Sequence, residues 1–129
     1  MKGEPIVILL VEDDEAHAEI ARRNFAASHI ANRLIHVADG QAALESLERR
    51  RFDLLVLDIN MPRLDGLSLL KLVRARAEWN DTLVLMLTTE GQDSDRDEAL
   101  ALGATGYMMK PFKPNELLAR VSALVSGAP

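Results

Sequence analysis

The sequence of 129 residues contains no cysteine. The chain can therefore form no disulfide bond, thiolate nucleophile or cysteine-bound metal site, and this absence fits a reducing compartment. Long hydrophobic runs are also missing. The first apolar run, Ile6–Val11, is too short to span a membrane and lacks the form of a secretory signal. We therefore expect a cytoplasmic protein with no membrane partner.

The chain has no excess of basic residues. Its 15 Lys and Arg residues are outnumbered by 20 Asp and Glu residues, which gives a formal net charge of −5. This balance, without any basic arm or stripe, argues against DNA as a partner. The length and a hydrophobic fraction of 48% predict one domain over residues 1–129. We expect its core to run from about Ile6 to Val125, followed by a disordered tail at Ser126–Pro129.

Five short apolar runs alternate with five segments of helical character. The predicted strands are Ile6–Val11, Leu34–Val37, Leu54–Leu57, Leu83–Leu87 and Gly106–Met109. The predicted helices are Glu15–His29, Gln41–Arg50, Leu67–Glu78, a short one that ends at Leu102 after a loop over Gly91–Arg96, and one that begins at Pro114. This alternation predicts an α/β fold in which a five-stranded parallel sheet carries helices on both faces.

The stretch Phe52–Gly66, which reads FDLLVLDINMPRLDG, is the most informative part of the chain. The apolar run Leu54–Leu57 is typical of a strand that is covered on both faces, and it ends on the carboxylate of Asp58. Open α/β sheets bind ligands at the carboxyl ends of their strands, which is where Asp58 is expected. Taken alone, Asp58 could equally be a turn or capping residue.

The ends of the other strands distinguish these alternatives, because parallel strands end at the same edge of a sheet. The residues expected there are Glu12, Asp13, Asp14, Asp58, Thr88 and Lys110. Converging carboxylates repel one another unless a cation compensates, and Mg²⁺ favours carboxylates together with phosphate oxygens. A lysine and a hydroxyl that face such a cluster can stabilise a transferring phosphoryl group. The residues alone therefore suggest phosphoryl chemistry at Asp58.

Four motifs occupy these strand ends in chain order: VEDD at 11–14, LDINMPRLDG at 57–66, LTTE at 87–90 and GYMMKPF at 106–112. Together they resemble the receiver domains of two-component response regulators, and the resemblance runs from about Ile6 to Val125. It implies a doubly wound, flavodoxin-like and CheY-like fold with the strand order 2-1-3-4-5 and five helices.

The resemblance implies a role for each site residue. Asp58 would accept a phosphoryl group from a sensor histidine kinase or a histidine phosphotransfer protein. Thr88 and Lys110 would contact the phosphoryl oxygens, and Tyr107 would turn inward when Thr88 moves. Mg²⁺, or Mn²⁺ in its place, would be held by Asp13, by Glu12 partly through water, by Asp58 and by the backbone carbonyl of Asn60.

The resemblance also implies an output and a lifetime. The chain would be a stand-alone switch that binds another protein through the face of its fourth helix, fifth strand and fifth helix, and its catalysis would be limited to its own phosphorylation and dephosphorylation. A homodimer through that face is left open. Asn60 and Glu90 form a polar pair that predicts quick self-dephosphorylation, and Thr89 would narrow access for small phosphodonors. The Lys110–Pro111 peptide bond is expected to be cis.

Two alternatives remain open at this point. One is a metal-dependent aspartyl-phosphate phosphatase of the haloacid dehalogenase-like class, but such enzymes need a second acid two residues after the nucleophile, where this chain has Asn60. The other is a degenerate receiver that acts as a phosphorylation-independent binding module. Asp14 is expected to cap a helix and not to bind metal.

Overall fold

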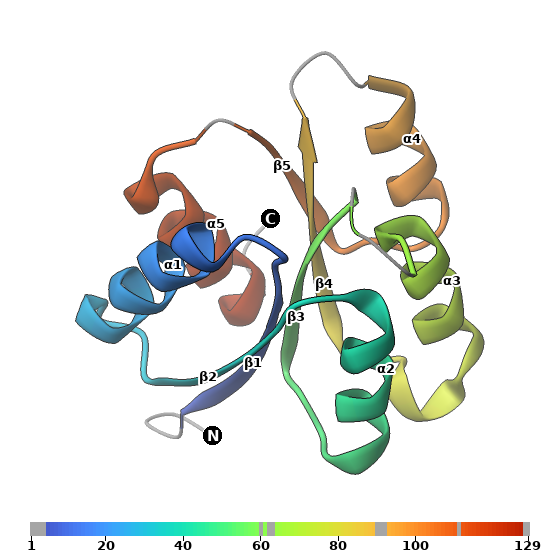
Figure 1. Cartoon of the computed structure of the whole chain (residues 1–129), viewed down its shortest axis with the longest axis horizontal. Coiled ribbons are helices and arrows are strands. Elements are labelled where there is room, and N and C mark those ends of the chain that lie inside the picture. The colour runs from blue at the N-terminus through green and yellow to red at the C-terminus, as the bar shows by residue number, and fades with distance from the viewer. Residues whose placement is uncertain (1–4, 60, 62–63, 90–92, 111, 128–129) are drawn as a thin grey trace.

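The computed structural model describes residues 5–59, 61, 64–89, 93–110 and 112–127. In these residues the strands are β1 (Ile6–Val11), β2 (Asn32–Val37), β3 (Leu54–Asp58), β4 (Leu83–Thr89) and β5 (Gly106–Lys110). They form one parallel sheet in the order β2-β1-β3-β4-β5 (Figure 1). The predicted five-stranded parallel sheet and its strand order are confirmed.

Helices connect the strands and cover both faces of the sheet. They are α1 (Glu15–Ala27), α2 (Gly40–Arg49), α3 (Gly66–Ala75), α4 (Asp93–Ala101) and α5 (Pro114–Ser126), with a short 3-10 helix, η1 (Ala77–Trp79), after α3. Helices α1 and α5 cover one face, and α2, α3 and α4 cover the other (Figure 1). This arrangement confirms the predicted doubly wound α/β fold.

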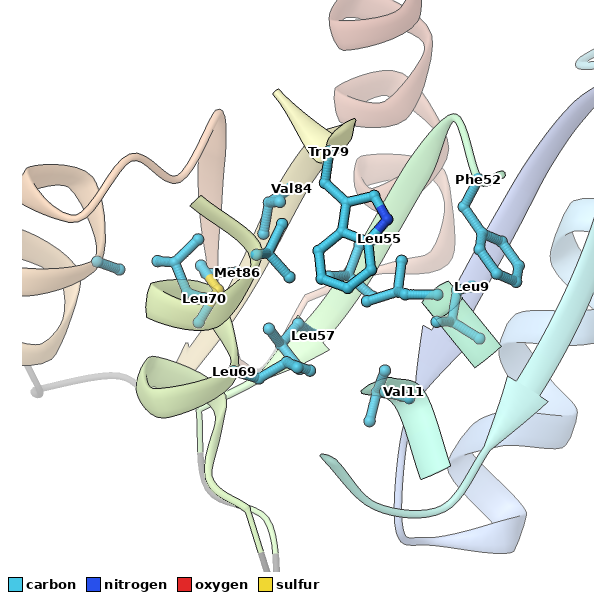
Figure 2. Close-up of a cluster of buried hydrophobic side chains, with 14 of the residues drawn as sticks. Leu9, Val11, Phe52, Leu55, Leu57, Leu69, Leu70, Trp79, Val84 and Met86 are labelled. Atoms are coloured by element: carbon cyan, nitrogen blue, oxygen red, sulfur yellow. The ribbon is translucent and has the colours of Figure 1, made fainter. Parts of the chain in front are cut away.

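Strand β3 lies at the centre of the sheet, and all of its residues are buried. Leu54 and Val56 pack into the core beneath α1 and α5, whereas Leu55 and Leu57 pack into the core on the side of α2 and α3. Figure 2 shows this second cluster, which also contains Trp79. Each buried leucine contributes about 1.5–3 kcal/mol, so the register of β3 is strongly fixed. Asp58, at the end of the strand, is thereby held at the carboxyl edge of the sheet.

Several element boundaries differ from the prediction; α1, for example, ends at Ala27 and not at His29, and β4 continues to Thr89. Strand β2 begins at Asn32 and not at Leu34, because the polar pair that opens it already pairs with β1, starting from Ile6 opposite Asn32. The predicted loop over Gly91–Arg96 is wrong from Asp93 onward, where α4 begins. The first turn of α4 contains Asp93 and Asp95, and acidic side chains are favourable there because they face the positive end of the helix dipole.

The ends of two other helices also differ. Helix α3 ends at Ala75, short of the predicted Glu78, because Arg76 is extended and η1 follows. The predicted disordered tail over Ser126–Pro129 is wrong for its first two residues, since Ser126 belongs to α5 and Gly127 caps that helix with a φ of +75°. Residues 128–129 lie outside the described part of the chain, so the prediction is not tested there. Among the residues listed above, no helix is long and apolar enough to cross a membrane.

Candidate functional site

Asp58 and Lys110 meet at the carboxyl edge of the sheet. Asp58 ends β3 and Lys110 ends β5, and β4 lies between these two strands. The Lys110 ammonium donates a hydrogen bond to Asp58 Oδ2. The Asp58 side chain is only 10% exposed and that of Lys110 is 29% exposed. The sheet topology therefore joins a carboxylate and an ammonium that are 52 residues apart in the sequence.

Glu12 follows β1 and points toward the same lysine. Its carboxylate is 6% exposed, and Oε1 lies 3.8 Å from Lys110 Nζ. The other oxygen, Oε2, accepts a hydrogen bond of 3.1 Å from the backbone N–H of Asp14. Asp13, between these two residues, is exposed. The first and third strands thus both bring a nearly buried carboxylate to Lys110.

Asp14 caps a helix, whereas the Glu12 carboxylate points toward Lys110. It is the N-cap of α1, and its Oδ1 accepts a hydrogen bond of 3.0 Å from the backbone N–H of His17. This bond lowers the pKa of Asp14. The prediction that Asp14 caps a helix is confirmed.

The charge of Lys110 reflects these neighbours. Burial alone would lower the pKa of its ammonium. The hydrogen bond that Lys110 donates to Asp58 and the negative charges of Asp58, Glu12 and Asp13 outweigh burial and raise the pKa above its usual value. Lys110 therefore remains a cation at neutral pH and offsets the repulsion among the three carboxylates.

Thr88 is buried near the end of β4, the strand between those that carry Asp58 and Lys110. Among the described contacts, its hydroxyl does not bond to either of these residues. Its hydroxyl donates a hydrogen bond of 3.3 Å to the carbonyl oxygen of Met108 on β5. Tyr107, the residue before Met108, is half-buried. The guanidinium of Arg96 on α4 lies 5.6 Å from the centre of the Tyr107 ring, and Arg120 on α5 donates a hydrogen bond of 2.8 Å to the Tyr107 carbonyl oxygen.

Close backbone contacts hold the start of α3 against the end of β3. The N–H of Gly66 donates a hydrogen bond of 2.9 Å to the carbonyl oxygen of Ile59, which closes the loop between β3 and α3. A Cβ on Gly66 would lie 2.4 Å from the carbonyl oxygen of Asp58. Asp65 caps α3 by accepting a hydrogen bond from the N–H of Ser68 at 2.9 Å. Because Gly66 has no side chain, the start of α3 can lie this close to the Asp58 carbonyl oxygen.

Several predicted site residues lie outside the described residues. These are Asn60, Glu90 and Pro111, with the Lys110–Pro111 peptide bond, and the side chain of Thr89. The predicted backbone ligand and the predicted tuning residues therefore stay predictions.

The metal prediction can be compared with the carboxylates that are described. Within the described part of the chain, no group of three or more Asp, Glu or His residues is arranged so that it could hold a metal ion. The carboxylate oxygens of Glu12, Asp13 and Asp58 nevertheless fit the chemistry of Mg²⁺, which prefers oxygen ligands and completes its shell with water and phosphate oxygens. In this structure the Lys110 ammonium offsets the negative charge of Glu12 and Asp58.

A mostly apolar cavity of about 310 Å³ adjoins the cluster. It lies between α1, the start of α5 and the ends of the central strands, and its lining includes Ile20, Leu117 and Phe112 as well as Glu12 and Lys110. Ile20 is 54% exposed, the largest value among the exposed large hydrophobic residues of the described chain. An apolar surface therefore borders the charged site.

Sequence reasoning missed His36. This residue near the end of β2 has a side chain that is only 9% exposed, and its Nε2 lies 2.7 Å from the carbonyl oxygen of Glu12. The strand order places β2 beside β1, so the end of β2 could have been searched together with the other strand ends. Its partner, however, is a backbone oxygen, which leaves no pattern in the sequence.

Known proteins resemble this chain in fold and in sequence. The model of the response regulator receiver domain matches residues 8–122. Response regulator MprA from Mycobacterium ulcerans (strain Agy99) is 42% identical over 118 residues, which cover 92% of this chain and 49% of that protein. This chain thus spans about half the length of the curated relatives it matches.

Solved structures give the same result. A putative response regulator from Chloroflexus aurantiacus J-10-fl has a TM-score of 0.89 and 31% identity, over 95% of this chain and 99% of that one. The receiver domain of the sensor histidine kinase PA1611 from Pseudomonas aeruginosa PAO1 has a TM-score of 0.84 and 31% identity, over 95% of this chain and 98% of that one. That structure has a magnesium ion coordinated in its active site cleft.

Proposed function

Because this chain belongs to the family of response regulator receiver domains, we propose that it is a phosphorylation-dependent switch with Asp58 as its phosphoacceptor. The observation that carries this proposal is the hydrogen bond between the nearly buried Asp58 and Lys110, with the Glu12 carboxylate beside them. An aspartate in this position can serve as a nucleophile, and a fixed cation next to it can stabilise the charge that moves during transfer.

The phosphodonor is a phosphohistidine on a sensor histidine kinase or a phosphotransfer protein. An Asp58 carboxylate oxygen attacks the phosphorus atom, the bond from phosphorus to the imidazole nitrogen breaks, and the leaving imidazole takes up a proton from solvent water. The Lys110 ammonium exchanges its hydrogen bond to the Asp58 carboxylate for one to a phosphoryl oxygen. The buried Thr88 hydroxyl exchanges the Met108 carbonyl for another phosphoryl oxygen.

Glu12, Asp13 and Asp58 would hold a divalent cation, Mg²⁺ or Mn²⁺, together with the backbone carbonyl of Asn60. When bound, the cation offsets the negative charge of the phosphoryl group during transfer. The oxygen donors of this chain support the assignment, as does the magnesium ion in the cleft of the PA1611 receiver domain.

The output is the binding of another protein through the face of α4, β5 and α5. Thr88 and Tyr107 connect the site to this face, because the Thr88 hydroxyl is bonded to β5 at Met108 and Tyr107 precedes that residue. Arg96 and Arg120 in turn connect Tyr107 to α4 and α5. We propose no catalysis by this chain beyond its own phosphorylation and dephosphorylation, with Asn60, Glu90 and Thr89 tuning the latter. A second copy of the chain is one candidate for the bound protein.

The apolar cavity beside the site is the proposed docking surface for the phosphodonor. A histidine donor must bring its ring to Asp58, and the cavity is lined by Lys110 and Glu12 as well as by the exposed Ile20 on α1. A donor that covers Ile20 would bury apolar surface while it excludes water from the reacting groups.

The test is the intact mass of the purified protein after incubation with acetyl phosphate, with and without Mg²⁺, beside an Asp58→Asn variant. We expect a gain of one phosphoryl group that needs both Mg²⁺ and Asp58. If Thr89 excludes this small donor, a phosphorylated histidine phosphotransfer domain should produce the same gain. Failure with both donors would overturn the proposal and favour a phosphorylation-independent binding module.

A further inference from the structure

His36 on β2 makes a hydrogen bond that determines how the acidic loop after β1 is held. Its Nε2 lies 2.7 Å from the carbonyl oxygen of Glu12. A carbonyl oxygen can only accept, so Nε2 must carry the proton and donate. The same residue, Glu12, also donates its backbone N–H to the carbonyl oxygen of Val37 at 3.0 Å. Both polar backbone groups of Glu12 are therefore fixed by β2.

The bond from His36 acts on the peptide unit between Glu12 and Asp13. The carbonyl group of Glu12 and the N–H of Asp13 belong to the same rigid plane. A hydrogen bond to that oxygen therefore restricts rotation of the plane, and with it the direction in which the Cα of Asp13 presents its carboxylate. Asp13 itself is exposed, so little packing holds its side chain.

The surroundings of the His36 ring restrict its orientation and so maintain its hydrogen bond to Glu12. The side chain lies on the same face of β2 as Leu34, which packs against the core beneath α1 and α5. It is 9% exposed, and its other ring nitrogen, Nδ1, lies 3.9 Å from the 85%-exposed Glu15 carboxylate at the start of α1. A buried ring between a strand and a helix has few other orientations.

We propose that His36 is a positioning residue that holds Glu12 and Asp13 in place to receive Mg²⁺. This inference rests on the proposed function, because it concerns the metal ligands named there. Hydrogen bonds that orient metal ligands lower the cost of ordering them on binding, and losing one typically weakens metal affinity about 10- to 100-fold. His36 would act through Glu12 and would not touch the metal.

The test compares two amides at this position. In His36→Gln the side-chain amide nitrogen reaches the place of Nε2 and can donate to the Glu12 oxygen. In His36→Asn the amide reaches only as far as Nδ1. The dissociation constant of Mg²⁺ is measured by calorimetric titration of the unphosphorylated, folded protein. We expect it to be about tenfold higher than wild type in His36→Asn and close to wild type in His36→Gln.

Two controls separate the possible failures. Asp13→Asn should abolish Mg²⁺ binding, and His29→Asn, which removes an exposed histidine, should leave the affinity unchanged. If Asp13→Asn binds Mg²⁺ like wild type, the proposed metal site itself is wrong. If Asp13→Asn abolishes binding but His36→Asn binds normally, or both His36 variants weaken binding equally, the metal site stands and the positioning role of His36 is overturned.

A measurement on the wild-type protein covers the case in which the variants fold poorly. Long-range ¹H–¹⁵N NMR correlations report which imidazole nitrogen carries the proton. We expect the Nε2–H form for His36, with a proton protected from exchange and a resonance that shifts when Mg²⁺ is added. An Nδ1–H form, or a resonance that ignores Mg²⁺, would contradict the proposal.

Discussion

The Lys110 ammonium and the Asp58 carboxylate share a hydrogen bond across the width of a strand, since Lys110 ends β5, Asp58 ends β3 and β4 lies between them. Two carboxylates, those of Asp58 and Glu12, lie within 4 Å of the same nitrogen. Much of the stability and reactivity of this edge of the sheet should therefore depend on the charge of one lysine.

The first prediction is that the stabilisation from Lys110 is lost at high pH. Burial would lower its pKa, but the bond to Asp58 and the carboxylate charges raise the folded-state pKa above the usual value of 10.5. A group whose pKa is higher in the folded state stabilises fully below the unfolded-state pKa and loses this effect as pH rises through the folded-state pKa. The unfolding free energy of wild type minus that of Lys110→Met should be constant from about pH 7 to about pH 10 and shrink above it.

Urea titrations followed by circular dichroism at a series of pH values would measure this difference. Lys71→Met, which removes an exposed lysine on α3, is the matched control and should show a flat difference over the same pH range. A difference between wild type and Lys110→Met that stays flat or grows through this window would contradict the prediction.

The second prediction separates docking from chemistry. Ile20→Asp should slow phosphoryl transfer from a phosphorylated histidine phosphotransfer domain about tenfold or more, because it removes apolar surface worth about 1.5–3 kcal/mol when buried. Phosphorylation by acetyl phosphate should be unchanged, since Ile20 lies on α1 and is not one of the groups proposed to bind the phosphoryl group or the metal ion. Both rates can be measured by intact mass over time.

Leu72→Asp is the control for this experiment, because Leu72 is 41% exposed but lies on α3, away from the cavity. It should leave both rates at the wild-type value. Equal slowing by the two variants would show that the effect is not local, and a normal rate for Ile20→Asp with the protein donor would rule out the proposed docking surface.

The observed positions of Asp58 and Lys110 show which features of this fold can be predicted from the sequence. Asp58 and Lys110 could be placed together because unbroken apolar runs locate the strands and parallel strands end at one edge. The start of α4 at Asp93 was missed because its first turns are polar and only Ala99 of that helix is buried. The two polar residues that open β2 hid its start for a similar reason.

The contacts that sequence could not supply have backbone atoms as partners. His36 bonds to the carbonyl oxygen of Glu12, and Thr88 bonds to that of Met108. Every residue has such an oxygen, so neither contact produces a recognisable pair of side chains in the sequence. These bonds become visible only when the register of neighbouring strands is known.

The third prediction concerns the loop that follows the acceptor. Gly66→Ala should destabilise the protein by about 3 kcal/mol, because the new Cβ would lie 2.4 Å from the Asp58 carbonyl oxygen and 2.7 Å from Ile59 Cα, and neither backbone atom can move without shifting β3. Phosphorylation at Asp58 should also slow. Urea unfolding and the intact-mass assay measure the two effects.

Gly106→Ala is the matched control on β5. Its new Cβ would lie 3.5 Å from a side-chain atom of Leu124, which is an ordinary contact. This variant should change stability by no more than about 1 kcal/mol. If Gly66→Ala were tolerated as well as Gly106→Ala, the close approach of the loop to Asp58 would be wrong.

The last prediction concerns the Tyr107 ring, which must leave Arg96 if it turns inward on phosphorylation. The Arg96 guanidinium is itself held by Asp97 at 3.1 Å and Asp93 at 3.7 Å, and it lies 5.6 Å from the ring centre. Replacing it by the uncharged side chain in Arg96→Met removes the cation–π contact that the ring makes in this structure. The ratio of inward to outward Tyr107 in the unphosphorylated protein should therefore rise about two- to fivefold.

Tyr107 is the single tyrosine of the sequence, so ¹⁹F NMR of protein labelled with fluorotyrosine reports this ring without ambiguity. Arg120→Met is the control, because Arg120 bonds to the carbonyl oxygen of Tyr107 and not to its ring. A shift in Arg96→Met that Arg120→Met does not reproduce would locate the restraint in the ring contact. Equal shifts in both variants would instead mean that the backbone of β5, and not Arg96, controls the position of Tyr107.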